Sequence, residues 1–181
     1  MNKKEGYENK RMDAREMKIE FWVPGIPRPG GSKRAFPIRK KDGTFIKMGI
    51  ADANPKVKEW RSDVINACQK VFSGLPLMGP LRFEVIFILP YRMKDFKTGR
   101  NAWMLKDCAP KYCMTKPDSL KLRRSTEDSL TGILYRDDAQ IVDGHDKKIY
   151  GFKPGAKILV ERLEDEEISS KTTSIKKGNG A

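Results

Sequence analysis

Alternating apolar and polar residues predict the strands of this chain. Residues 18–23 (KIEFWV) alternate in this way and are rich in side chains that favour strands. Residues 80–90 (PLRFEVIFILP) contain the longest apolar run, which predicts a strand in the middle of a sheet. Two further strands are expected late in the chain, at residues 139–151 and 156–164, with a Pro-Gly turn at residues 153–155 between them.

Apolar residues that recur every three or four positions predict two helices. The first spans residues 54–74, where Asn54 suits the N-cap, Pro55 suits the first turn and Gly74 suits the end. The second spans residues 119–132. The inward stripe comprises Val57, Trp60, Val64, Ala67, Cys68 and Val71 in the first helix, and Leu122, Thr126, Leu130 and Ile133 in the second.

Two long stretches without such periodicity separate these elements. Residues 24–43 hold four prolines and four glycines and predict a loop, followed by a short strand at residues 44–49. Residues 91–116 predict a second loop, and loops of this length in a compact domain are usually functional or disordered. The order of strands and helices predicts an α+β fold, in which a mixed β-sheet carries helices packed on one face.

The length and composition of the chain fit one domain. Of the 181 residues, 17–163 are expected to fold, between a flexible leader at residues 1–16 and a flexible tail at residues 164–181. No apolar run reaches the roughly 18 residues of a membrane span, and the charged start of the chain is unlike a secretory signal. Three cysteines without a framework spacing favour free thiols in a reducing cytoplasm.

The charge of the chain favours a polyanionic partner such as nucleic acid, with solubility alone as the alternative. Lys and Arg outnumber Asp and Glu by 37 to 24, and the formal net charge is +13. Residues 24–61 hold ten cations against three acids, and residues 91–116 hold seven against two. Cations neutralise phosphates, and aromatic side chains interleaved with them can stack on exposed bases. Among these aromatic residues, structural roles are expected for Trp60 and Phe45. For Phe96 and Trp103, a structural role and a base-stacking role both stay open.

Two acidic segments contrast with this basic background. Asp137 and Asp138 are adjacent, and neighbouring carboxylates repel unless a cation or hydrogen bonds offset their charge. Asp118 follows Pro117, so the chain arrives extended and turns helical directly afterwards. Taken alone, Asp118 is more typical of a helix N-cap. The functional alternative for Asp118 is a ligand of Mg²⁺.

Several motifs surround these acids in a fixed order: KPD at 116–118, KLRR at 121–124, DSLTG at 128–132, YRDDAQIVD at 135–143 and a lysine at 148. Over residues 111–150 this pattern resembles the RusA-type Holliday junction resolvases. The Pro-rich, basic stretch PGIPRPGGSKRAF after the first strand is similar to that family more weakly. The resemblance implies a RusA-like fold and a dimeric, Mg²⁺-dependent endonuclease that makes paired nicks in four-way DNA junctions.

By position, the resemblance implies that Asp118 and Asp138 are metal ligands, with Mg²⁺ as the expected ion and Mn²⁺ as a substitute. It also implies that Arg124, where the family often has lysine, and Lys148 are catalytic basic residues at the scissile phosphate. The family's second acid, two residues after Asp118, is replaced by Leu120. In an extended segment, positions i and i+2 face the same side, so a leucine there removes one carboxylate from the site.

Other acids near the second helix are candidates to replace the missing carboxylate. Asp128 follows Arg124 by four residues, which favours a helical ion pair over a ligand role. Asp137 is more typical of a turn or of a residue that supports the ligands. Glu127 stays open as a substitute.

Two functions follow from this combination. The first is a Mg²⁺-dependent endonuclease that resolves four-way or branched DNA in recombination and repair, of phage or prophage type, in the cytoplasm of a bacterial host. Two symmetric nicks need two active sites, which implies a homodimer. The second is a junction-binding protein on the same scaffold, in which Leu120 impairs catalysis. The residues expected to contact DNA are Arg28, Lys33, Arg34, Arg39, Lys40, Lys97, Arg100 and Arg123.

Overall fold

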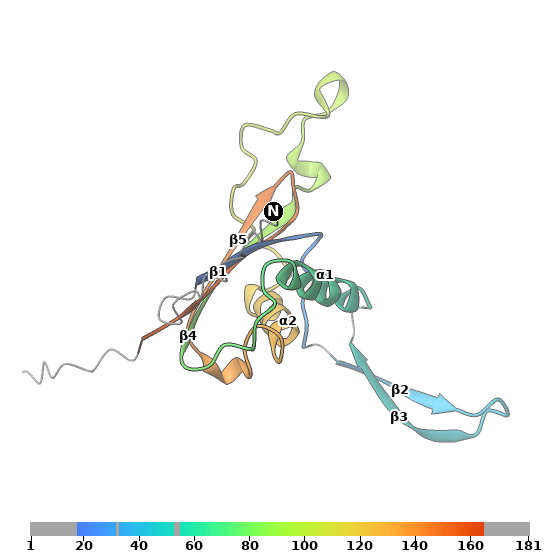
Figure 1. Ribbon diagram of the computed structural model, residues 1–181. Coiled ribbons are helices and arrows are strands. Elements are labelled where there is room, and N and C mark those ends of the chain that lie inside the picture. Colours follow the sequence, from blue (N-terminus) through green and yellow to red (C-terminus); the bar gives the residue numbers. More distant parts are fainter. Residues whose placement is uncertain (1–17, 32, 53–54, 165–181) are drawn as a thin grey trace, which may run out of the picture.

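The computed structural model describes residues 18–31, 33–52 and 55–164, and its four-stranded sheet confirms the α+β fold. Two helices, α1 (Val57–Gln69) and α2 (Ser119–Leu130), cover one face of this sheet (Figure 1). The predicted leader, Asn54 and all but the first residue of the predicted tail lie outside the described residues. None of the described helices has the length and apolar character that crossing a bilayer requires.

β4 (Leu81–Pro90) lies inside the main sheet, as its long apolar run predicted. The strand order is β1-β6-β4-β5, with β1 at Lys18–Pro24, β5 at Ile141–Gly151 and β6 at Gly155–Arg162. β4 runs antiparallel to β6 and parallel to β5. The consecutive strands β5 and β6 are therefore not neighbours, and β5 forms an edge of the sheet.

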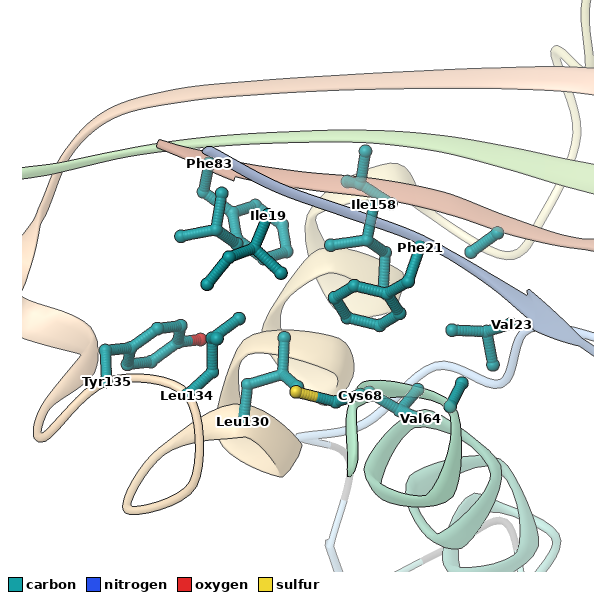
Figure 2. Packing of buried hydrophobic residues seen from close by; sticks show 14 of the residues in the cluster. Ile19, Phe21, Val23, Val64, Cys68, Phe83, Leu130, Leu134, Tyr135 and Ile158 are labelled. Carbon is teal, nitrogen blue, oxygen red and sulfur yellow. The ribbon is translucent and has the colours of Figure 1, made fainter. Parts of the chain in front are cut away.

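The core forms where the sheet meets the two helices (Figure 2). Trp60 is 1% exposed, which confirms the structural role expected for it, and its indole N–H donates to the Thr126 hydroxyl at 3.2 Å. From the sheet, Phe83 points toward the helices, where Leu130 and Val64 complete the packing (Figure 2). Burying each large apolar side chain contributes about 1.5–3 kcal/mol, so this layer holds α2 firmly against the sheet.

α1 is shorter than its apolar periodicity predicted. It ends at Gln69 rather than Gly74, because the N–H groups of Val71 and Phe72 both donate to the Cys68 carbonyl and the chain turns. Phe72 folds back onto the core. Val71 is 55% exposed, so its predicted place on the inward stripe was wrong.

The Pro- and Gly-rich stretch at residues 24–43 contains a strand in its second half, where the prediction of a loop was wrong. β2 (Lys33–Arg39) pairs antiparallel with β3 (Phe45–Asp52) in a separate two-stranded sheet. Pro37 is tolerated because each strand of a two-stranded ribbon has a free edge, where no N–H is required. Gly43 makes the connecting turn with φ of 86°. The hairpin extends away from the main sheet and the helices (Figure 1).

Residues 91–116 form an irregular segment that extends beyond the end of β4 (Figure 1). Asp95 is 5% exposed and accepts hydrogen bonds from the side chain and backbone of Arg92, which lowers the pKa of Asp95. Phe96 packs against neighbouring rings and is partly buried, whereas Trp103 is 74% exposed. The segment also holds two short 3₁₀ helices, η1 (Met93–Asp95) and η2 (Gly99–Asn101).

Candidate active site

Asp118 lies directly before α2 and does not act as a side-chain cap. Its backbone is extended, with φ −67° and ψ 139°, and its carboxylate makes no capping hydrogen bond. The side chain is 56% exposed and pairs with Lys121 at 3.4 Å. Exposed ion pairs of this kind are weak, so the carboxylate stays available to a cation. One of the two interpretations of Asp118 was a helix N-cap, and the structure does not show that contact.

Lys148 of β5 fixes the segment that leads into Asp118. Its ammonium group donates to the backbone carbonyls of Thr115 and Pro117, both at 2.7 Å. The Thr115 hydroxyl also shares a hydrogen bond with the Tyr150 hydroxyl at 3.1 Å. Lys148, expected at a DNA phosphate, thus directs two of its three donors into the protein. No short-range pattern indicates this contact, because Lys148 lies 33 and 31 residues from its two partners.

The two carboxylates of the Asp137-Asp138 pair have different surroundings. Asp137 precedes the 3₁₀ helix η3 (Asp138–Gln140) and accepts a hydrogen bond from the Ala139 N–H at 2.9 Å. Its own N–H donates to the Gln140 side chain at 3.0 Å, which confirms the turn role expected for Asp137. The Asp138 side chain is exposed, and its carboxylate makes no hydrogen bond or ion pair with any other residue that the structure describes.

Asp118 and Asp138 lie at opposite ends of a stretch of β5. Asp138 comes just before the first residue of the strand, Ile141, whereas Lys148 holds the chain next to Asp118. The seven residue steps from Ile141 to Lys148 cover about 23 Å of strand. The described contacts within one chain therefore bring Asp118 to Lys148, and none brings Asp118 to Asp138.

Arg123 is held between α2 and β5. Its guanidinium pairs with Glu127 at 2.6 Å, and the side chain is only 19% exposed. It also lies over Gly144, in the space that a side chain at that position would need. Arg123, expected at DNA, and Glu127, considered as a substitute ligand, are thus bound to each other.

The outer surface of α2 presents Leu120 and Arg124. Leu120 is 71% exposed, so the position of the missing carboxylate faces solvent. Arg124 is exposed as well. Asp128 pairs with Arg61 of α1 at 3.1 Å, so the predicted ion pair between Asp128 and Arg124 was wrong. Arg124 is therefore an exposed basic group of the helix, one turn after Leu120.

Most cations expected at DNA lie on the two extended segments. The strands of the hairpin β2–β3 present cations to solvent, and the turn between the strands adds another. Apolar side chains of the hairpin are exposed beside these cations, Met48 at 54% and Ile50 at 72%. The exposed group comprises Lys33, Arg34, Arg39, Lys40 and Arg100, whereas Arg28 and Lys97 are partly buried and Lys97 pairs with Asp107 at 3.6 Å.

The acids of this region suit a hard divalent cation. Asp118 and Asp138 are exposed, and neither is used for capping. Mg²⁺ prefers carboxylate oxygens and keeps several waters, so one or two protein ligands suffice. In the part of the chain that the structure describes, no three His, Cys, Asp or Glu side chains are grouped to hold a metal. An ion here would depend on few protein ligands and on water.

Comparison with known proteins supplies a family for this arrangement. A family model described as endodeoxyribonuclease RusA matches residues 27–161, most of the chain. The match includes α1, α2 and the hairpin, and it contains Asp118, Asp138 and Lys148. A search of curated proteins found no match.

Proposed function

Since this chain belongs to the RusA family of endodeoxyribonucleases, we propose that it nicks four-way DNA junctions in a Mg²⁺-dependent reaction. The family resolves Holliday junctions and acts on branched DNA. The observation that supports the proposal for this chain is the exposed carboxylate of Asp118, which makes no capping hydrogen bond and directly follows the Pro117 carbonyl that Lys148 holds. On the family resemblance alone, we further propose a role in phage or prophage recombination and repair, in the cytoplasm of a bacterial host.

Each charged residue of the site has a distinct proposed role. Asp118 and Asp138 would hold the metal, which when bound would polarise the phosphodiester and activate the attacking water. Arg124, exposed on α2, offsets the negative charge of the scissile phosphate through hydrogen bonds from its planar guanidinium. Lys148 keeps Asp118 oriented by holding the two carbonyls before it, so it acts as a positioning residue.

The separation of Asp118 and Asp138 along β5 supports a site shared between two chains. In a dimer with two-fold symmetry, any contact that one chain makes with its partner is made reciprocally. We propose a homodimer in which Asp118 of one chain faces Asp138 of the partner subunit. Two such sites would allow the paired nicks that resolve a junction.

The second candidate is a junction-binding protein with impaired cleavage. The exposed side chain of Leu120 supports it, because that position faces solvent without offering a ligand. The basic hairpin and Arg124 would still bind phosphates, since their charge does not depend on the metal.

Incubation with a synthetic four-way junction, with and without Mg²⁺, tests the proposal. Paired nicks are expected with Mg²⁺, and binding without nicking is expected in a chelator. Asp118→Asn, purified in the same way, should bind the junction without cutting it and so controls for contaminating nucleases. Binding without nicking in both Mg²⁺ and Mn²⁺ would support the impaired protein. If the wild type shows no junction-selective binding, both candidate functions are overturned.

A further inference from the structure

Asp146 is a third carboxylate near α2, on the same face of β5 as Lys148. Side chains alternate along a strand, so residues 144, 146, 148 and 150 share one face. In the parallel pairing with β4, Asp146 lies opposite Val85, which is 2% exposed on the helix-covered side of the sheet. The register is continuous from Asp143 to Gly151, so this orientation is not interrupted by a bulge. Asp146 therefore points toward the side that carries the helices.

Two contacts locate Asp146 beside the first turn of α2. On one side of it, Gly144 lies under the guanidinium of Arg123, which begins the second turn of the helix. On the other side, Lys148 holds the carbonyl of Pro117, just before the helix. Asp146 is between Gly144 and Lys148 on this face of the strand. It therefore faces the stretch of chain that contains Asp118.

Among the residues that the structure describes, none pairs with the carboxylate of Asp146. The side chain is exposed, and within the described ranges it makes no hydrogen bond or ion pair. Lys148, two residues along the same face, directs two of its donors to backbone carbonyls instead. Two carboxylates that face one another raise each other's electrostatic energy, and a cation between them offsets this cost.

We propose that Asp146 is a metal ligand, and that with Asp118 it binds the divalent cation from the strand side of the site. This inference rests on the proposed Mg²⁺-dependent function. It explains how the chain keeps two carboxylates at the start of α2 although Leu120 supplies none. In the shared site proposed above, Asp138 of the partner subunit would be the third ligand.

Binding of Mn²⁺ to the full chain tests this assignment without relying on cleavage. The electron paramagnetic resonance signal of free Mn²⁺ reports the affinity. Asp146→Asn is expected to weaken Mn²⁺ binding about tenfold or more. Asp107→Asn removes the same charge from a side chain that is 98% exposed, and it should leave binding unchanged. The double variant Leu120→Asp with Asp146→Asn should recover most of the affinity, because it returns a carboxylate to the helix side.

The possible outcomes distinguish this assignment from the proposed function. Wild-type Mn²⁺ affinity in a folded Asp146→Asn protein would overturn the assignment, and junction cleavage by the wild type would still support the function. If Asp146→Asn selectively loses Mn²⁺ affinity and the wild type does not cleave the junction, the result would support the assignment and count against the function. No Mn²⁺ binding by the wild type, or an equal loss in Asp107→Asn, would also overturn the assignment.

Discussion

At the scale of single residues, the adjacent carboxylates of Asp137 and Asp138 have different roles, one in a turn and one in the proposed metal site. The charge of Asp137 is offset by the backbone N–H of Ala139, so this residue shapes the start of β5. The carboxylate of Asp138 is exposed and stays available to a cation. Burial, followed by the charges of Glu127 and Asp138, raises the pKa of Tyr135, which keeps this hydroxyl neutral.

Exchanging one carboxylate at a time separates these roles. Asp138→Asn is expected to abolish nicking while junction binding is kept or strengthened, since a negative charge leaves the DNA-facing surface. Asp137→Ala should keep nicking and cost about 1 kcal/mol of folding stability, because the side-chain acceptor of the Ala139 N–H is lost. Nicking gels, binding titrations and urea unfolding measure the three quantities. Full nicking by Asp138→Asn would rule that residue out as a ligand.

Local chemistry predicts only those residue roles that depend on sequence neighbours. The turn role of Asp137 was predictable, because its partner lies two residues along the chain. The partner of Asp128 was not, because Arg61 lies 67 residues away and reaches it only after α1 packs on α2. The same limit applies to Lys148, whose resemblance-based place at a phosphate did not anticipate its bonds to backbone carbonyls.

At the scale of elements, the start of α2 is positioned by β5 rather than by a helix cap. Lys148→Met should therefore lower stability by about 2 kcal/mol, since two hydrogen bonds from a charged donor are lost. It should also reduce the nicking rate more than junction affinity, because Asp118 loses its orientation. Lys147→Met, on the opposite face of the same strand, is the matched control and should change neither quantity much.

Partial recovery of the nicking rate in Lys148→Arg would support positioning, because arginine can also donate to both carbonyls. An unchanged rate in Lys148→Met, with stability reduced, would show that the contact serves folding alone.

The hairpin β2–β3 shows why this part of the fold was missed. Proline and glycine dominate residues 24–43 and are depleted in strands, so a loop was the expected outcome. The hairpin does not pack on the main core, so its apolar residues do not follow the pattern of a strand with one buried face. Met48 and Ile50, for example, are both largely exposed. The turn was predictable, because Asp42-Gly43 has the chemistry that a hairpin turn requires.

Neutralising two hairpin cations tests the proposed DNA contact. The double variant Arg34→Gln with Lys40→Gln should weaken junction binding and reduce the slope of log affinity against log salt by about 2. Thermal stability should be unchanged, since both side chains are exposed. Lys58→Gln with Lys70→Gln removes the same charge from α1 and from the residue that follows it, and serves as the control. An equal loss in both double variants would indicate net charge rather than the hairpin.

At the scale of the whole molecule, the elements were predicted better than their arrangement. The strands at β1, β4, β5 and β6 and the helix α2 follow from local periodicity, which records the face that each element buries. The strand order was not predictable in this way, because β4 enters between two strands that come later in the chain. The contact that places Asp118 beside Lys148 of β5 is also non-local, so the candidate site could be assembled only from the fold.

Mixing two inactive variants tests whether the sites are shared between chains. Refolding Asp118→Asn together with Asp138→Asn gives mixed dimers in which one shared site keeps both native carboxylates. About a quarter of wild-type nicking is then expected, half of the dimers being mixed and each having one intact site. Each variant refolded alone sets the background. No recovery in the mixture would place both ligands in the same chain.

The Arg123 side chain occupies the space between β5 and α2 that a side chain at position 144 would need. A Cβ atom at position 144 would overlap the Arg123 guanidinium, which already pairs with Glu127. A bulkier strand residue would push the arginine outward, and Glu127 would lose its partner. Related chains are therefore expected to vary at these two positions together: where glycine is lost from the strand, a shorter or repositioned helix side chain should appear as compensation.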